Sequence, residues 1–194
     1  MVFIVQVFNL LIVSRNYKIR DQSQLYFLSF ATVNWIDVFI RPLYCEILIE
    51  SLRFCIKQKG LEVYSWCIMS SHAHLIIGSN DKRIEDIVRD LKRHTSKEIL
   101  KAIEANPQES RKDWMLWMFE RAGKRNPNNK TYQFWQQNNH PIELFDNAIM
   151  EQKLDYIHNN PVEAGIVNEP EHYIYSSAKD YAGMKGAVPI IFIE

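Results

Sequence analysis

The sequence carries no excess of charge of either sign. Its 194 residues include 23 Lys and Arg residues and 23 Asp and Glu residues, which gives a formal net charge of zero. Proteins that coat nucleic acid indiscriminately are strongly basic, so this class is excluded. Any polyanionic partner must therefore bind to a local patch of positive side chains.

Cysteine is scarce. The three cysteines, Cys45, Cys55 and Cys67, are odd in number and show no CxxC spacing. This usage predicts a reduced compartment and no disulfide framework. We therefore expect a cytoplasmic protein.

No apolar run is long enough to span a bilayer. The most apolar stretch, residues 1–13 (MVFIVQVFNLLIV), is well short of the roughly 20 residues that a spanning helix needs. It also lacks the positive start and the small-residue cleavage site of a signal peptide. We expect no membrane partner and treat residues 1–14 as an N-terminal extension. One hypothesis is that translation of the native protein begins near Val13; the alternative is an added strand or a short packed helix.

The rest of the chain alternates between the hydrophobic periods of strands and helices. Proline and glycine mark several boundaries, and Gly60 has the position of a helix C-cap. We predict strands over residues 25–35, 61–69, 73–78 and 132–136, and helices over residues 43–59, 82–105, 114–120 and 142–159. Residues 121–130 have the composition of a basic loop, and residues 160–165 that of a short helical turn.

Two histidines, His72 and His74, lie one residue apart in an apolar run that favours a strand. Side chains at i and i+2 of a strand leave the same face, so both imidazoles can reach one cation. A single histidine in such a run is more often a packed, hydrogen-bonded residue. Two on one buried face each need a polar partner, and histidine is the commonest side-chain ligand of metals. The pattern therefore leaves both a packed pair and a metal site open.

Two motifs carry a resemblance to a known family. The run CIMSSHAHLI, residues 67–76, resembles the histidine-hydrophobe-histidine (HUH) strand of single-tyrosine transposases. The run YIHNNPVEAG, residues 156–165, is similar to the tyrosine motif of their REP-associated branch. The similarity covers most of residues 15–181, and the two motifs occur in the order that the family has.

The resemblance implies an α+β fold, in which helices flank an antiparallel sheet in a ferredoxin-like arrangement. It implies an HUH domain over residues 15–168, followed by a C-terminal tail over residues 169–194. In the family the histidines bind Mg²⁺ or Mn²⁺, and the tyrosine attacks a phosphodiester of single-stranded DNA. The products are a 5′-phosphotyrosine and a free 3′-OH. By resemblance, His72 and His74 are metal ligands here and Tyr156 is the nucleophile.

The chemistry needs these residue types. A phosphodiester is negative and repels a nucleophile, so a cation on its non-bridging oxygen neutralises it and orients it for in-line attack. A phenol has an unperturbed pKa of about 10, and a nearby cation favours the reactive phenolate. A covalent intermediate also conserves the energy of the cleaved bond, which permits rejoining without ATP.

Asn160 is the candidate for a third metal ligand, because the family places an amide side chain four residues after the tyrosine. On a continuous helix Tyr156 and Asn160 share a face. The alternative is a helix N-cap, because Asn160 is followed by Pro161 and then by Glu163 at the third position. His158 is rotated about 200° from Tyr156 at the 100° per residue of a helix, so we assign it no metal role.

The relatives bind folded hairpins through basic helices and loops, so we expect single-stranded DNA with a hairpin or palindromic element as partner. The protein is expected to act as a monomer or a homodimer. A charged helix face is usually solvated surface, and phosphate contact is the alternative. The candidates for DNA contact are Arg89, Lys92, Arg93, Arg121, Lys124, Arg125 and Lys130, with Trp135 or Tyr132 for base stacking.

Three functions remain open on the sequence. The preferred one is a transposase-like strand transferase or site-specific single-strand endonuclease that acts through Tyr156. The second is a non-catalytic, domesticated DNA-hairpin binder that has kept the fold. The third is a metal-dependent hydrolase or replication initiator, although the chain has no room for the partner domain that an initiator usually carries.

Overall fold

The computed structural model describes residues 19–127 and 131–193. The expectations for residues 1–14 and for Lys130 lie outside these ranges. The elements in chain order are β1 (Tyr26–Ala31), η1 (Val33–Trp35), η2 (Val38–Ile40), α1 (Pro42–Lys59), β2 (Leu61–Ile68), β3 (His72–Ser79), α2 (Ile84–Ala105), α3 (Lys112–Lys124), β4 (Ile142–Glu143), α4 (Asn147–Glu163), η3 (Pro170–His172) and α5 (Ala178–Tyr181).

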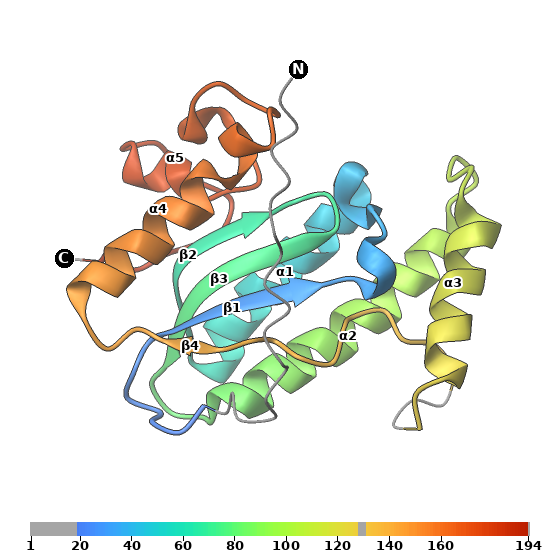
Figure 1. Ribbon diagram of the computed structural model, residues 1–194, viewed down its shortest axis with the longest axis horizontal. Coiled ribbons are helices and arrows are strands. Elements are labelled where there is room, and N and C mark those ends of the chain that lie inside the picture. Colours follow the sequence, from blue (N-terminus) through green and yellow to red (C-terminus); the bar gives the residue numbers. More distant parts are fainter. Residues whose placement is uncertain (1–18, 128–130, 194) are drawn as a thin grey trace, which may run out of the picture.

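The strands form one antiparallel sheet in the order β2-β3-β1-β4 (Figure 1). The elements β1, α1, β2, β3, α2 and β4 follow the β-α-β-β-α-β succession of a ferredoxin-like fold. The predicted α+β architecture is confirmed. Helix α3 is inserted between α2 and β4, and α4 follows the last strand.

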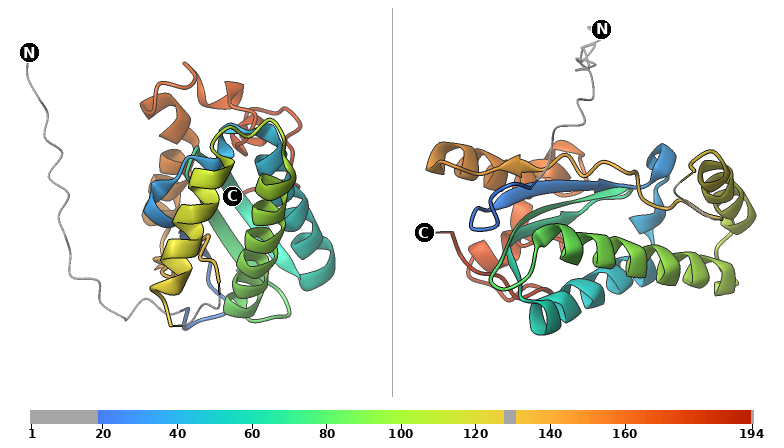
Figure 2. Two further views of the ribbon diagram at one scale, coloured as in Figure 1. Left: turned by 90° about the vertical axis from the view of Figure 1, so that its right-hand side faces the viewer. Right: turned by 90° about the horizontal axis from the view of Figure 1, so that it is seen from below.

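The sheet separates two packed layers. Helices α1 and α2 cover one face, while α4 lies on the other, as the right-hand view of Figure 2 shows. On the α1/α2 side, Leu28, Phe30 and Leu75 belong to the main core. On the α4 side, Phe27 and Ile76 pack with Ile157 of α4 in a smaller cluster. Successive residues of a strand point to opposite faces, so β1 and β3 supply both layers.

The sequence signals for helix ends hold at α1. Pro42 occupies the first helical position, where the N–H that proline lacks has no helical partner. Gly60 ends the helix with a φ of 70°, a left-handed conformation that suits glycine. Helix α2 is likewise confirmed, starting two residues later than predicted. None of the helices in residues 19–127 and 131–193 is long and apolar enough to cross a membrane.

One predicted strand is shorter than expected, and another is absent. β1 ends at Ala31 rather than Trp35, because the chain then turns into a 3-10 segment. Residues 132–136 form no strand and make one isolated bridge, between Trp135 and Thr32. Phe134 and Trp135 are both buried, so the segment has no alternation of inward and outward side chains.

The segment before and within α4 also differs from the prediction. Ile142 and Glu143 pair with β1 as β4, and the helix starts only after Asp146, whose carboxylate accepts from Ile149 N–H at 2.7 Å. The helix then continues through Pro161 to Glu163 instead of ending at residue 159. The separate turn expected over residues 160–165, and with it the capping role of Asn160, is therefore wrong.

The C-terminal residues run along the outer side of β2. Ile68 N–H donates to the Tyr175 carbonyl, Ser177 N–H to the Trp66 carbonyl, and Ile191 N–H to the Val63 carbonyl, each at 2.9 Å. Tyr181 adds a bond from its hydroxyl to the Tyr64 carbonyl at 3.1 Å. The final segment thus continues the hydrogen bonding of the sheet beyond β2.

Candidate functional site

His72 and His74 leave the same face of β3, the face that α4 covers. Their ring centroids lie 4.7 Å apart, with the planes at 72°. β3 pairs along its length with β1 on one side and β2 on the other, and this fixes the backbone of both residues. The sequence prediction that the two imidazoles share one face is confirmed.

His74 is buried without a hydrogen-bond partner. It is 5% exposed, and neither Nδ1 nor Nε2 has a partner among the described residues. Phe27 stacks on its ring at 5.4 Å between centroids. Burial lowers the pKa of His74 to about 3, and the positive charges of His72 and Lys153 act in the same direction. The imidazole is therefore neutral near pH 7, with lone-pair capacity that the fold does not use.

His72 is held from one side. Ser71 Oγ lies 3.3 Å from its Nδ1, which makes Nε2 the nitrogen directed to a ligand. Burial also lowers the pKa of His72, so this ring too favours its neutral, metal-binding form.

Tyr156 comes to the histidines from α4, more than 80 residues later in the chain. Its ring centroid lies 5.1 Å from that of His74 and 5.9 Å from that of Phe27. The side chain is 41% exposed, although its ring contacts a nearly buried histidine. Packing of α4 on β2 and β3 thus brings together the predicted nucleophile and the predicted metal ligands.

Lys153 is a member of this cluster that the sequence analysis missed. Its Nζ lies 5.2 Å from the centroid of the Phe27 ring and 5.7 Å from that of Tyr156. It precedes Tyr156 by three residues and therefore shares its helix face. That spacing was visible in the sequence, but only the packing of α4 shows that the face points at the histidines.

Asn160 lies one helical turn after Tyr156. Its Nδ2 donates to the Tyr156 carbonyl at 3.4 Å, and this leaves Oδ1 as the atom able to bind a cation. The continuous helix gives Asn160 and Tyr156 a common face. Its role as a ligand stays a prediction.

His158 faces away from this cluster, as the helical rotation predicted. Its Nε2 lies 2.9 Å from Ser177 Oγ and 3.2 Å from Ser65 Oγ, and Ser177 Oγ also accepts from Trp66 N–H at 3.0 Å. Burial lowers the pKa of His158 to about 4. This polar network, made of His158, Ser65 and Ser177, joins α4 to β2 and to the C-terminal segment.

The loop after β1 brings an indole to the other histidine. The ring of Trp35 lies 5.3 Å from that of His72, at an interplanar angle of 77°. Trp35 is 57% exposed, and both Asn34 and Trp35 have positive φ, at 55° and 54°. Holding a non-glycine residue in this left-handed region costs on the order of 1–2 kcal/mol. Sequence reasoning gave no signal for this turn.

Two of the predicted DNA contacts point into the protein. Lys92 Nζ donates to the Gln136 carbonyl at 2.7 Å, and burial lowers its pKa to about 8. Trp135 is 5% exposed and donates from Nε1 to Thr95 Oγ1 at 3.0 Å. In this conformation the lysine bonds within the fold and the indole face is closed to a base, so the structure does not favour a DNA role for either.

The remaining described candidates for DNA contact are on the surface. Arg89 pairs with Asp86 and Asp90, Lys124 pairs with Glu120, and Arg121 lies over the Trp117 ring. Exposed ion pairs contribute little to stability, so phosphates can displace them at low cost. Contact with DNA stays a prediction for the exposed side chains, which are Arg89, Arg93, Arg121, Lys124, Arg125 and Tyr132.

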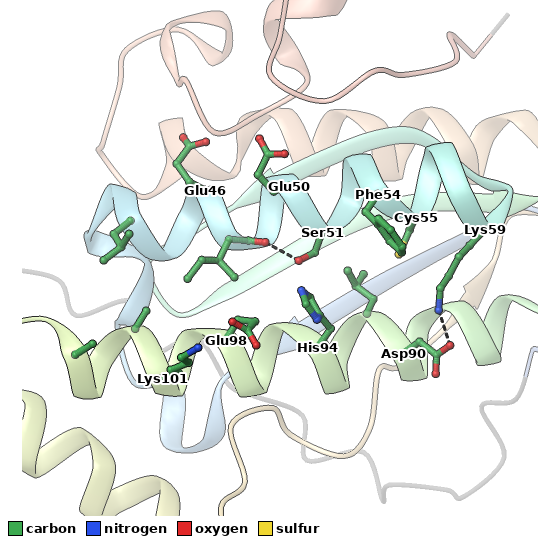
Figure 3. Close-up of a pocket in the computed structure, with 15 residues that line it drawn as sticks. Glu46, Glu50, Ser51, Phe54, Cys55, Lys59, Asp90, His94, Glu98 and Lys101 are labelled. Carbon is green, nitrogen blue, oxygen red and sulfur yellow. Dashed lines mark hydrogen bonds and ion pairs between the residues drawn. The ribbon is translucent and has the colours of Figure 1, made fainter.

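A groove lies on the opposite side of the sheet, between α1 and α2. Its volume is about 730 Å³, and Figure 3 shows Phe54 and Cys55 of α1 facing His94 of α2 across it. The Lys59–Asp90 ion pair, 2.6 Å long, lies at one end. The sheet separates this groove from the His72 and His74 side chains, so it is no part of the site.

The chemistry of the cluster fits a divalent cation. The buried nitrogens of His74 lack partners, and this is the state expected of a ligand whose metal is part of the working site. No group of three or more His, Cys, Asp or Glu side chains in residues 19–127 and 131–193 could hold a metal. A cation at the two imidazoles therefore needs an amide, water or phosphate oxygen to complete its shell.

Comparisons with known proteins agree with this arrangement. Residues 30–160 match the family described as "Transposase IS200 like". The structure of "the REP associates tyrosine transposase bound to a REP hairpin" is similar over 93% of each chain, with a TM-score of 0.63 and 14% sequence identity, which supports the shared fold. A crystal structure of a proposed transposase from Deinococcus radiodurans R1 covers 77% of this chain and 97% of its own, at 20% identity and a TM-score of 0.44, too low to carry detail. No curated protein matches the sequence.

Proposed function

Because the chain belongs to the IS200-like transposase family, we propose that it cleaves and rejoins single-stranded DNA through a covalent bond to Tyr156. The substrate is a strand with a hairpin or palindromic element, like the REP hairpin bound by the structural relative. The 3′-OH released by cleavage remains available to reverse the reaction or to join another strand.

The observation that carries the proposal is the convergence of Tyr156 with the histidine pair. The phenol ring and the His74 ring are 5.1 Å apart, although they come from separate elements. A packed core gives no reason for a half-exposed tyrosine beside a histidine without hydrogen bonds. A nucleophile beside two imidazoles that can bind a metal gives such a reason.

His72, His74 and Asn160 are the residues that would hold Mg²⁺ or Mn²⁺. When bound, such a cation neutralises a non-bridging phosphate oxygen and favours the phenolate form of a nearby phenol. Mn²⁺ accepts both imidazole nitrogens and an amide oxygen as ligands. Mg²⁺ prefers oxygen, so the amide oxygen suits it better than the imidazole nitrogens do.

The chain's own groups supply the rest. Tyr156 Oη forms a bond to phosphorus while the bond from phosphorus to the 3′ oxygen breaks, and the leaving oxygen takes up a proton as the 3′-OH. The phenol proton passes to water, which the 41% exposure of Tyr156 permits. Lys153 places a positive charge beside the phenol ring, where it attracts the negative phosphate of the strand.

The test is the formation of a covalent adduct. The chain is incubated with Mn²⁺ and a library of single-stranded oligonucleotides with a labelled 3′ end, each containing a hairpin with variable flanks. A labelled protein band that survives denaturing electrophoresis is expected for the wild type. It should be absent in Tyr156→Phe, absent with EDTA, and reduced at least about 100-fold in His74→Ala, since loss of a nucleophile or metal ligand removes several kcal/mol of transition-state stabilisation.

A matched control is Tyr132→Phe, which removes a hydroxyl from an equally exposed tyrosine outside the cluster and keeps the ring that base stacking would use. It should form adduct at the wild-type rate. Hairpin binding without any adduct in the wild type would instead identify a non-catalytic binder. Cleavage that leaves no protein-linked strand would indicate hydrolysis by water.

A further inference from the structure

The most exposed aromatic ring next to the histidine pair is Trp35. More than half of it is accessible to solvent, whereas the other aromatic contacts of the pair, Phe27 and Tyr156, are buried or serve the proposed chemistry. An indole contributes most to stability when its large apolar surface is buried. Its exposure here gains the fold little, and this points to a ligand.

The backbone places this ring at a cost. Asn34 and Trp35 have φ values of 55° and 54° in succession, a conformation that L-residues avoid and that the surrounding structure must impose. Asn tolerates positive φ better than most residues, whereas a bulky side chain such as that of Trp35 rarely adopts it. Such outliers concentrate where a side chain must be held in a functional position.

The restraint comes from Thr32, which is fully buried. Its carbonyl accepts from Trp35 N–H at 3.1 Å, and its Oγ1 donates to the carbonyl of Ile36 at 2.8 Å, so it closes the turn from both sides. Thr32 N–H also donates to the Ser71 carbonyl at 2.9 Å. Ser71 directly precedes His72, so the turn that carries the indole is tied to the strand that carries the histidines.

We propose that Trp35 is a stacking platform for one unpaired base, that of the nucleotide next to the phosphate at the histidine pair. This inference rests on the proposed function for the identity of its ligand, a single strand of nucleic acid. Every base has a π-face, so an aromatic platform binds a base without selecting its sequence. The indole holds the flanking nucleotide, and the phosphate is thereby positioned between His72 and Tyr156.

The test separates base stacking from phosphate attraction. Oligothymidylate of 12 nucleotides is compared with an abasic strand of equal length, which has the same phosphates but no bases. Binding is measured by fluorescence anisotropy in EDTA with Tyr156→Phe as the parent chain, so that neither metal nor covalent chemistry contributes. We expect the parent to prefer oligothymidylate over the abasic strand, and Trp35→Ala to weaken oligothymidylate binding about 5- to 100-fold while leaving abasic binding unchanged.

Trp35→Phe keeps a π-face and should retain most of the preference. Trp114→Ala is the matched control, because Trp114 is exposed to a similar extent, 48%, but lies on α3. It should leave the preference unchanged. Circular dichroism melts identify any variant that fails to fold, and the Trp35→Phe chain then provides the comparison.

The proposal is overturned if the parent binds both strands equally, if Trp35→Ala retains the preference, or if Trp35→Ala weakens both strands alike. These outcomes are independent of the adduct assay. A chain that shows the stacking preference but never forms an adduct contradicts the proposed reaction and leaves the platform in place. A chain that forms the adduct but shows no preference for oligothymidylate contradicts the stacking platform and leaves the proposed reaction in place.

Discussion

Two buried histidines lie in α4 and β3, and their surroundings differ in one respect. His158 has two serine hydroxyls within hydrogen-bond distance, whereas His74 has no partner for either nitrogen among the described residues. A buried polar group without a partner lowers the free energy of unfolding by about 1–3 kcal/mol. Removing one member of a buried hydrogen bond has a similar cost, because the other member is left without a partner. Replacing the histidine by an apolar residue should therefore stabilise the fold at position 74 and destabilise it at position 158.

We predict that His74→Leu raises the free energy of unfolding of the metal-free chain by about 1–3 kcal/mol, and that His158→Leu lowers it by a similar amount. Urea unfolding in EDTA measures both. Added Mn²⁺ should stabilise the wild type and have no effect on His74→Leu, because only the wild type keeps both ligands. Equal destabilisation by the two substitutions would show that the His74 imidazole is satisfied within the fold.

The sequence identified some residues of the cluster and not others, for a physical reason. His72, His74 and Tyr156 stand in local patterns that the chain displays directly. Lys153 and Trp35 depend on where α4 and the β1 loop lie in space, and no short spacing encodes that. Lys92 is an error of the opposite kind. A lysine on a charged helix face predicts an exposed side chain, but in the fold its ammonium group donates to the Gln136 carbonyl of a neighbouring loop.

Helix α4 is the element on which the site depends, since it carries Tyr156, Lys153 and Asn160. The His158 network fixes its opposite face to β2 and to the C-terminal segment. Ser177 is the centre of that network, because its hydroxyl lies within 3.1 Å of Ser65 Oγ and of His158 Nε2. The position of Tyr156 is therefore set from the side of α4 that faces away from the histidine pair.

We predict that Ser177→Ala lowers the free energy of unfolding by about 1–3 kcal/mol and slows adduct formation several-fold without abolishing it. Unfolding in urea and the rate of adduct formation check the two effects. Ser176→Ala is the control, because Ser176 is equally buried but its hydroxyl accepts from Ala178 N–H rather than contacting α4. An unchanged adduct rate in Ser177→Ala would mean that apolar packing alone positions the helix.

Periodicity predicted most elements, and it failed where other forces decide. Helix α1 and the β2–β3 hairpin followed from hydrophobic spacing and from Gly60. Pro161 suggested a break, yet the residue before a proline is only disfavoured in a helix, and Pro161 is buried together with Ile157 and His158 of α4. Tertiary packing therefore outweighs the local preference and extends the helix by four residues beyond residue 159.

On the scale of the whole molecule, one chain brings the predicted residues together, because Tyr156 lies against His74 of its own chain. We therefore expect the proposed reaction to need no helix from a second copy. The zero net charge agrees with binding through a local surface rather than through the entire protein.

We predict that a mixture of His72→Ala and Tyr156→Phe chains forms no more adduct than either chain alone. In a shared site, one chain would supply the histidines and the other the tyrosine, and mixing would restore activity. Denaturing gels of the adduct, over a range of protein concentrations, measure the outcome. Recovery that rises with concentration would place the working tyrosine in a partner subunit.

The C-terminal segment along β2 protects one edge of the sheet against aggregation with other chains. An outermost strand offers a row of unpaired backbone groups, a template on which other chains can add and aggregate. Here Tyr175, Ser177 and Ile191 already occupy those groups. Truncation before Tyr175 would expose these backbone groups of β2. The truncated protein should therefore aggregate while His72 and His74 keep their arrangement in β3.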